Sequence, residues 1–437
     1  MSNLRTILEE RVREADPSLV GDLGNNRVRC FSCGHCCPIP ESQSGVCKVR
    51  FNRGGKLYVP WGYTAGMQCD PIEKKPFFHA HPGALAYSFG MLGCDLHCGY
   101  CQNWVTSQAL RDPNAVSPPV EVSPESLVRD ALDQGAKVLV STYNEPLIAS
   151  EWAVAVFKEA KSAGLLTGFV SNGNGTPQVL EYLRPWLDLY KVDLKSFSDR
   201  HYHELGGRIG PILETIRRIH QMGLWLEIVT LLIPGFNDSP DELRQLTEFL
   251  AGISPDIPWH VTAFHADYKM NDTRSTNVED LLRALEIGRE AGLRYIYAGN
   301  LPGMVGEWED TRCPNCSETQ SAATATTSKI TASLPKAVVQ VAPRRFPAAG
   351  PHNSTARSLP FLSCRISARV CLQSQVVEIC RFNGICADGR FARPGRAQLG
   401  CSVYRPCAGN QASPWPCLSF SPPALPATSF HADSPPI

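Results

Sequence analysis

Short apolar runs alternate with amphipathic segments between residues 84 and 312 of this 437-residue chain. The apolar runs are rich in Val, Ile, Leu and Tyr, which is the composition of buried parallel strands. After a first strand in AYSFGML, strands are expected at KVLVSTY (137–143), LLTGFVSN (165–172), LDLYKVDLK (187–195), LWLEIVTLLI (224–233), WHVTAFH (259–265) and LRYIYAGN (293–300).

The segments between these strands carry helix-capping signals. Helix starts are expected at Ser123, Ser239 and Thr276, each of which stands directly before a helical pattern. Strand and helix alternate at intervals of roughly 30 residues, which predicts an α/β fold with a parallel sheet and right-handed crossovers. About six such units favour an open, partial (β/α)6 barrel over a complete eightfold one, with the active site at the carboxyl ends of the strands.

Composition divides the chain into three parts. Residues 1–83 form a cysteine-rich N-terminal extension, residues 84–316 form the barrel, and residues 317–437 lose every strand and helix pattern. The last part carries 12 Lys and Arg against 4 Asp and Glu, whereas residues 1–316 carry 30 against 38. We expect the tail to be disordered or to result from a shifted reading frame. The acidic balance of residues 1–316 argues against nucleic-acid binding.

Cellular location affects how the 18 cysteines are interpreted. The sequence has no apolar run of about 18 residues, so no membrane span is expected. Its N-terminus lacks the apolar core of a signal peptide, which predicts a cytoplasmic protein. Because reducing compartments disfavour disulfides, the cysteines indicate metal or cluster ligation.

Three cysteines, Cys94, Cys98 and Cys101, stand in the segment CDLHCGYC directly after the first expected strand. Thiolates are preferred ligands of iron–sulfur clusters. Three thiolates leave one iron without a protein ligand, and an open metal site can bind and polarise a small molecule. Gly93 and Gly99 allow the turns that wrap a loop around a cluster. The spacing therefore predicts a [4Fe–4S] cluster.

A structural zinc site is the alternative for this loop. Zinc prefers four ligands, so His97 would have to replace the missing thiolate. The simpler interpretation of His97 is a polar loop residue.

The segment CDLHCGYC also matches the radical S-adenosylmethionine (SAM) signature, in which an aromatic residue precedes the last cysteine. The stretch DPIEKKPFFHAHPGALAYSFGMLGCDLHCGYCQNW resembles the radical SAM enzymes of the AmmeMemoRadiSam system, which are relatives of the pyruvate formate-lyase activating enzymes. The resemblance extends from Cys30 to Cys316 through STYNEPLI, SNGNG, VDLKSF, LLIPGFND and WHVTAFHADYKMND. It implies a barrel of the radical SAM type in which SAM chelates the open iron. Reductive cleavage of SAM would give methionine and a 5′-deoxyadenosyl radical that abstracts a hydrogen atom.

The resemblance further implies that strand-end residues contact SAM. The motif at residues 143–146 would receive the methionine amino group, and the Glu145 carboxylate suits an ammonium group. Lys195 suits the SAM carboxylate, although a mutual ion pair with Asp193 is the alternative. The expected cofactor contacts are Tyr100, Asn144, Glu145, Asn172, Asp193 and Lys195, and no catalytic residue is assigned.

Later strand ends are expected to place Pro234, Gly235 and His260 or His265 at the barrel mouth. A lone histidine in such a position is more often structural, although its ring can also transfer protons.

A second metal site is predicted in the N-terminal extension. Cys30, Cys33, Cys37 and Cys47 supply four thiols within eighteen residues, and Cys36 is a fifth. Zinc accepts four thiolates, and a second iron–sulfur cluster suits them equally well. Buried idle thiols are the third interpretation.

The sequence leaves the substrate open. It is either a glycine of a partner protein, as in glycyl-radical activation, or a small molecule or another protein. The expected electron donor is a reductant protein such as ferredoxin or flavodoxin. The alternative is a non-catalytic module that binds zinc, an iron–sulfur cluster or nucleic acid through the N-terminal cysteines and CPNC (313–316). A nucleic-acid-binding module predicts a basic aromatic surface, whereas residues 1–316 carry a net charge of −8. A cluster scaffold without turnover is a third possibility.

Overall fold

The computed structural model of the chain describes residues 4–115, 117–312 and 319–321. The CPNC segment and the predicted tail therefore lie outside the described residues, except for residues 319–321. Among the described residues, no helix combines the length and apolar character that a membrane crossing requires.

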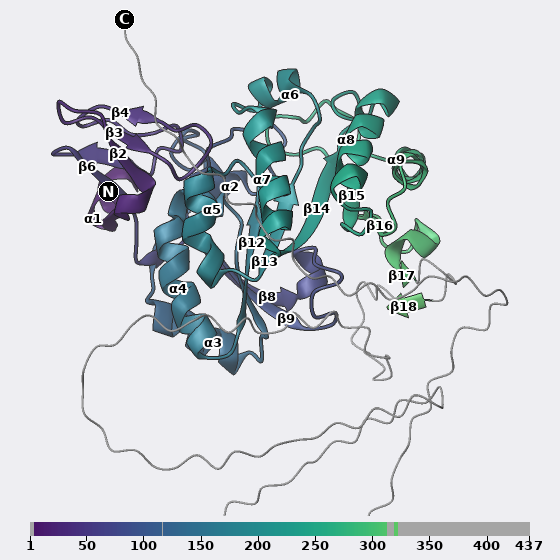
Figure 1. Cartoon of the computed structure of the whole chain (residues 1–437), viewed down its shortest axis with the longest axis horizontal. Helices are drawn as coiled ribbons and strands as arrows, with labels where there is room; N and C mark the ends of the chain where they lie inside the picture. Colours follow the sequence, from purple (N-terminus) through teal and green to yellow (C-terminus); the bar gives the residue numbers. More distant parts are fainter. Residues whose placement is uncertain (1–3, 116, 313–318, 322–437) are drawn as a thin grey trace, which may run out of the picture. The chain divides into compact units, whose positions relative to one another are not determined.

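An eight-stranded sheet is the centre of the described part of the chain (Figure 1). Its order is β16-β15-β14-β13-β12-β11-β9-β8, and every neighbouring pair is parallel except β8 with β9. The strands are β8 (Gly66–Pro71), β9 (Leu85–Gly90), β11 (Val138–Ser141), β12 (Leu166–Ser171), β13 (Leu189–Asp193), β14 (Trp225–Leu232), β15 (Trp259–Ala263) and β16 (Ile296–Gly299). The order ends at β8 and β16 without closing, so the predicted partial barrel is confirmed.

Six helical crossovers connect the parallel strands within the described residues, as predicted. They contain α3 (Pro124–Asp133), α4 (Ser150–Ser162), α5 (Pro177–Leu183), α6 (Asp199–Glu204) with α7 (Ile209–Met222), α8 (Pro240–Ile253) and α9 (Val278–Glu290). Figure 1 shows α4, α5 and α7 side by side along the outside of the sheet. Aromatic rings fill the layer between helix and sheet, with Phe157 of α4 in contact with Phe89 and Phe169 at centroid distances of 6.3 and 5.7 Å.

Two of the three predicted helix starts are correct. Ser123 caps α3 and Ser239 caps α8 through backbone N–H groups of the first turn. The prediction at Thr276 is wrong by one residue, because Asn277 caps α9 and forms a capping box with Asp280. The Thr276 hydroxyl instead donates to the Leu232 carbonyl at the end of β14.

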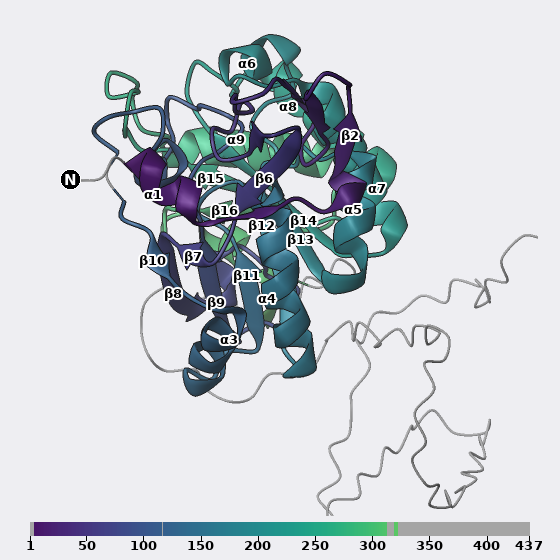
Figure 2. The same cartoon turned by 90° about the vertical axis from the view of Figure 1, so that its left-hand side faces the viewer.

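The N-terminal extension forms small antiparallel sheets beside the barrel (Figure 2). It contains α1 (Leu4–Glu10), β1 (Val12–Glu14), β2 (Val20–Asp22), β3 (Val28–Cys30), β4 (Pro38–Ile39), β5 (Phe51–Arg53), β6 (Lys56–Pro60) and β7 (Tyr63–Thr64). Sheets β1-β6-β5 and β2-β3-β4 are separate from the barrel sheet, whereas β8 belongs to it. The domain boundary expected at residue 83 therefore lies between two paired strands of one sheet.

The remaining described elements are short. They are the 3-10 turns Pro17–Leu19, Ile72–Lys74, Pro146–Ala149, Arg184–Trp186 and Gly306–Glu309, the helix α2 (Trp104–Ser107), and the strands β10 (Val120–Glu121), β17 (Thr311–Arg312) and β18 (Thr319–Ser321).

Candidate functional site

Residues 91–103, here called the cluster loop, connect the end of β9 to α2. The loop therefore starts at the carboxyl edge of the sheet, where the active sites of such barrels lie. Gly93 has φ +91°, and a Cβ atom there would lie 2.9 Å from Val49 Cγ1 and 3.0 Å from the Cys47 carbonyl oxygen. Only glycine fits this turn, since it combines a left-handed backbone with close packing.

The three predicted ligands in the cluster loop are shielded from solvent. Cys98 is buried, and Cys94 and Cys101 are half-buried. The Leu96 N–H donates to Cys94 Sγ at 3.4 Å, and Cys101 Sγ lies 3.2 Å from the Ser107 hydroxyl. Burial raises the pKa of Cys98 to about 11 and that of Cys94 well above its ordinary value. A bound cation would have to displace these protons, as metal ligation does.

The donor set of the cluster loop fits an iron–sulfur cluster. Three thiols on one loop lie within electrostatic range of their neighbours, and the Lys195 ammonium acts on Cys98. In the described part of the chain, no three Cys, His, Asp or Glu side chains stand close enough together to hold a metal ion. Formation of a ligand cage therefore requires the three thiols to move closer together.

Asp95 is a buried carboxylate that the sequence analysis missed. It is fully buried and accepts hydrogen bonds from the side-chain amides of Asn172 and Asn174, both at 2.7 Å. Its backbone carbonyl lies 3.1 Å from Nε2 of His35 in the N-terminal extension. Asp95 therefore connects the cluster loop to the loop after β12 and to the cysteine-rich segment.

Glu145 is buried at the end of β11 among protein donors. Its carboxylate accepts from the Leu147 N–H at 3.0 Å, the Ser171 hydroxyl at 2.7 Å and the Asn172 N–H at 2.7 Å. Burial, and then the nearby Asp95 carboxylate, raise the pKa of Glu145 to about 8. Glu145 thus joins the loops after β11 and β12 and retains capacity for one further donor.

Asn144 holds the beginning of the cluster loop, because its Oδ1 accepts from the Met91 N–H at 3.0 Å. The preceding residue, Tyr143, has φ +69°. A bulky residue in the left-handed region is strained, and such strain is concentrated at functional sites. The end of β11 is therefore held in an unusual conformation directly beside the cluster loop.

Asp193 and Lys195 form the ion pair that was one of the two interpretations of these residues. Lys195 Nζ lies 3.6 Å from Asp193 Oδ2, and Lys191 donates to Asp193 Oδ1. Burial opposes the charge of Lys195, but Asp193 and then Cys98 outweigh it and hold the pKa of Lys195 well above its usual range. The ion pair leaves Lys195 a cation close to the Cys98 thiol.

Tyr100 is buried inside the mouth. Its ring contacts Phe236 edge-on at a centroid distance of 5.9 Å, and its hydroxyl interacts with Cys98 and Lys195. The side chain therefore packs between the cluster loop and the loop after β14.

The loop after β15 covers part of the cluster loop. The Lys269 N–H donates to the Gly99 carbonyl at 2.9 Å, and Tyr268 stacks on Trp104 at 5.1 Å. The exposed His265 lies 3.0 Å from the Gln102 side-chain nitrogen, so the expectation that His265 reaches the mouth is met.

His260, the other of the two histidines expected at the mouth, does not lie there. His260 is the second residue of β15, and its Nε2 lies 2.7 Å from the buried Glu227 carboxylate. Glu227 also accepts from the Phe78 and His79 N–H groups and from the Trp225 indole. His260 therefore belongs to a polar network near the amino ends of the strands, opposite the cluster loop.

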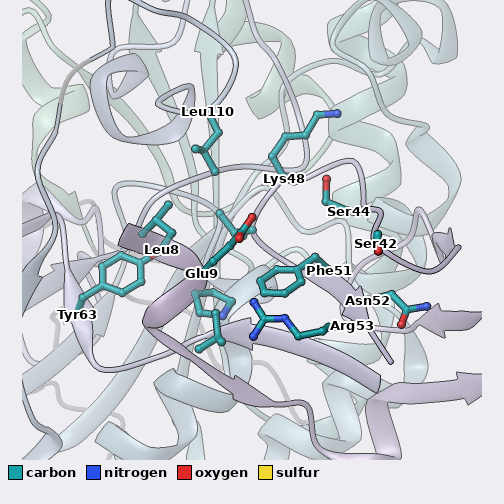
Figure 3. Close-up of a pocket in the computed structure, with 13 residues that line it drawn as sticks. Leu8, Glu9, Ser42, Ser44, Lys48, Phe51, Asn52, Arg53, Tyr63 and Leu110 are labelled. Carbon is teal, nitrogen blue, oxygen red and sulfur yellow. The ribbon is translucent and has the colours of Figure 1, made fainter. Parts of the chain in front are cut away.

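A separate cavity of about 170 Å³ is lined mainly by the N-terminal extension and also by Leu110, which follows α2 (Figure 3). Its walls include Leu8, Glu9, Phe51, Arg53 and Tyr63, whose side chains surround it in the figure. None of the expected cofactor contacts lines this cavity. It is distinct from the candidate site.

The part of the chain that contains the cluster loop is similar to known proteins. The model of the Radical SAM superfamily matches residues 90–250. An uncharacterized protein of Methanocaldococcus jannaschii is 34% identical over 296 residues, which cover 67% of this chain and 87% of that protein. This chain belongs to the radical SAM superfamily.

Radical SAM proteins of known name are also similar to the chain. A pyruvate formate-lyase-activating enzyme of Staphylococcus aureus is 27% identical over 243 residues, covering 51% of this chain and 92% of that enzyme. Among solved structures, a radical SAM methyltransferase from Sphaerobacter thermophilus shares 17% identity with a TM-score of 0.40, covering 50% of this chain and 67% of that one.

Membership of the radical SAM superfamily implies a [4Fe–4S] cluster and SAM as cofactors, and an enzyme of the radical SAM type. The alternative of a non-catalytic binding module is therefore not supported. His97 does not suit the alternative zinc site, since its ring packs against Gly206, where an added Cβ atom would lie 2.2 Å away.

Proposed function

We propose that Cys94, Cys98 and Cys101 hold a [4Fe–4S] cluster and that the surrounding strand ends bind SAM. The observation that carries this proposal is the position of three shielded thiols on one loop at the carboxyl edge of the sheet. When bound, the reduced cluster and SAM supply a 5′-deoxyadenosyl radical, which abstracts hydrogen from a substrate.

The chain's own side chains would orient SAM. Glu145 has one remaining acceptor position for the methionine ammonium, and Asn172 lies beside it, bonded to both Glu145 and Asp95. Lys195 offers a cation for the SAM carboxylate, while Asp193 and Lys191 hold that cation in place. Asn144 fixes the start of the cluster loop, and Tyr100 fills the space between that loop and the loop after β14.

The proposed chemistry is tested by 5′-deoxyadenosine formation. Purified protein, reconstituted without oxygen with iron and sulfide, is given dithionite and SAM. Production of 5′-deoxyadenosine is expected from the natural sequence and from Cys69→Ala, a control in β8 at the edge of the sheet. Cys94→Ala, Cys98→Ala and Cys101→Ala should each abolish it, because removal of one thiolate leaves the cluster under-ligated. Undiminished SAM cleavage in any of the three would contradict the assignment.

The proposed substrate class is a protein glycine, as in glycyl-radical activation. The similarity to pyruvate formate-lyase-activating enzymes supports this class, since it covers 92% of the S. aureus enzyme. The ordered motifs from STYNEPLI to WHVTAFHADYKMND further support placing the chain among the AmmeMemoRadiSam enzymes. A glycyl radical detected by electron paramagnetic resonance on a partner protein from the same organism would support the glycine substrate. Transfer of deuterium from a small molecule into 5′-deoxyadenosine would favour the other substrate class.

A further inference from the structure

Two turns of the N-terminal extension bring four cysteines together. Cys30 lies in β3 and donates its N–H to the Cys37 carbonyl at 3.0 Å, which closes the hairpin between β3 and β4. The second turn, residues 45–48, is joined to the first because the Val46 N–H donates to Cys37 Sγ at 3.5 Å. Cys47 follows in this second turn.

Three of these four thiols are withdrawn from solvent, and Cys37 is half-buried. Cys30, Cys33 and Cys47 have exposed fractions of only 5, 6 and 6%. Cys30 lies within electrostatic range of Cys33, Cys37 and Cys47. The fifth cysteine, Cys36, also lies within electrostatic range of Cys30, but it lines a mainly apolar hollow beside α5 and α7. Its removal therefore tests which thiols of this segment are ligands.

A buried cation near Cys30 and Cys47 lacks one hydrogen-bond partner. Arg50 is 1% exposed and donates through both terminal nitrogens to Glu151, at 2.7 and 2.8 Å. Its Nε atom is buried without a hydrogen-bond partner, and Cys30 and Cys47 lie within its electrostatic range. An unpaired buried N–H is costly, so Arg50 favours an anionic acceptor at this position. Thiolates around a metal centre supply such an acceptor.

The cysteine spacing favours iron–sulfur over zinc. Three of the four thiols come from one eight-residue stretch, residues 30–37. Such close runs are typical of iron–sulfur loops, whereas zinc sites usually combine two separated pairs.

The second set of thiols also lies directly against the cluster loop. The Cys47 carbonyl packs on Gly93, and His35 contacts the Asp95 carbonyl at 3.1 Å. Arg111 connects the two segments, because its terminal nitrogens donate to the Val46 carbonyl at 2.6 Å and the Leu96 carbonyl at 3.0 Å. A redox centre in the cysteine-rich segment would therefore be separated from the cluster loop by little more than one layer of backbone.

We propose that Cys30, Cys33, Cys37 and Cys47 hold a second iron–sulfur cluster that relays electrons to the cluster loop. One electron enters from a reduced ferredoxin or flavodoxin, and one electron leaves toward the first cluster, where SAM cleavage consumes it. The relay rests on the function proposed above, whereas the metal site itself does not. As in the cluster loop, no three of these side chains stand close enough together to hold a metal ion in the described part of the chain, so the proposal requires the four thiols to move together when the cluster is built.

Metal analysis of a variant without the first site tests the second site alone. In the triple variant Cys94→Ala/Cys98→Ala/Cys101→Ala, anaerobic reconstitution should still give iron and acid-labile sulfide in equal amounts. Adding Cys30→Ala and Cys33→Ala should remove both, whereas adding Cys36→Ala should remove neither. Zinc in place of iron, or no metal in the triple variant, would overturn the proposal. This outcome is independent of whether the natural sequence cleaves SAM.

The relay is tested by comparing electron donors. In Cys33→Ala, we expect 5′-deoxyadenosine formation with reduced flavodoxin to fall by about tenfold relative to formation with dithionite, because the small reductant reaches the first cluster directly. Cys36→Ala should leave the ratio of the two rates unchanged. An unchanged ratio in Cys33→Ala, when that variant has lost the second set of iron, would exclude the relay.

Discussion

At the scale of single residues, the mouth of the barrel depends on carboxylates that hold loops together. Asp95 accepts hydrogen bonds from two asparagine amides and Glu145 accepts them from three donors, so both carboxylates join neighbouring loops. The sequence placed Glu145 and Asn172 near the carboxyl ends of two expected strands, where the family resemblance implies contacts to SAM. It could not reveal Asp95, since burial of a loop carboxylate depends on partners 77 and 79 positions away.

The two histidines of the β15 region also show what the sequence cannot predict about single residues. His265 follows β15 and reaches the cluster loop, but His260 lies inside the strand and pairs with Glu227. The pattern of apolar positions could not separate these two residues, because the expected strand extended two residues beyond its actual end at Ala263. Nothing in the local sequence indicates the buried Glu227 partner.

Asp280 gives a pH-dependent prediction for the loop that covers the cluster loop. The Arg274 guanidinium donates to Asp280 at 2.6 and 3.0 Å and lowers the pKa of that carboxyl to about 2. A lowered carboxyl pKa stabilises the fold above the unfolded pKa of about 3.9, and this stabilisation is lost as the pH falls toward 2. Asp280→Asn should reduce the free energy of unfolding by about 1–2 kcal/mol at pH 7, allowing for the exposed arginine.

Urea unfolding at pH 7 and at pH 3 measures this effect. The difference between Asp280→Asn and the natural sequence should shrink at pH 3, whereas the exposed Asp133→Asn should behave alike at both values. An equal loss at both pH values would show that the charge of Asp280 is not the cause.

At the scale of secondary structure, the parallel strands were predictable and the antiparallel ones were not. The six expected strands after the first agree with β11 to β16 to within about three residues at each end, because buried parallel strands are continuous apolar runs. The edge strand β8 (GMQCDP) has no such run, since only one of its sides is paired. The short N-terminal strands leave a similarly weak pattern, so their sheets could not be predicted.

The turn at Gly93 provides a prediction for the cluster loop as an element. Gly93→Ala should lower the free energy of unfolding by about 2–5 kcal/mol, from left-handed strain plus the clash with Val49 and Cys47. The matched control is Gly135→Ala at the end of α3, which has φ +76° and open space around the position of the new Cβ. It should cost only about 1–2 kcal/mol.

Chemical denaturation of the two glycine variants gives the comparison, and iron content after reconstitution gives a second measurement. Gly93→Ala should also retain less iron, because the thiols that follow it are displaced. Equal destabilisation by the two variants would mean that the close packing of Gly93 against Val49 and Cys47 does not contribute to stability.

At the scale of the whole described molecule, a buried ion pair connects the N-terminal extension to the barrel. Arg50 and Glu151 of α4 have exposed side-chain fractions of 1 and 5%. Arg50→Met should lower the free energy of unfolding by about 3–5 kcal/mol, because Glu151 is left buried and charged. The double variant Arg50→Met/Glu151→Leu should recover much of this loss, since no unpaired charge remains.

The exposed pair Lys56 and Glu14, at 2.9 Å, is the matched comparison. Lys56→Met should change the free energy of unfolding by less than about 1 kcal/mol. The natural sequence and the three variants are compared in urea without metal. Metal binding at the second site then does not contribute to the measured stability. A double variant no more stable than Arg50→Met alone would contradict the explanation.

The attachment of the cysteine-rich segment also has a consequence for biosynthesis. Its contacts to the barrel span long stretches of sequence: Arg50 to Glu151 is 101 residues and Gly34 to Asn174 is 140. At ribosomal rates of about 5–20 residues per second, the cysteine-rich segment emerges about 5–20 s before α4 exists for it to pack against. During that interval its thiols are open to oxidation and to stray metal ions, so production in anoxic cells should give the most homogeneous protein.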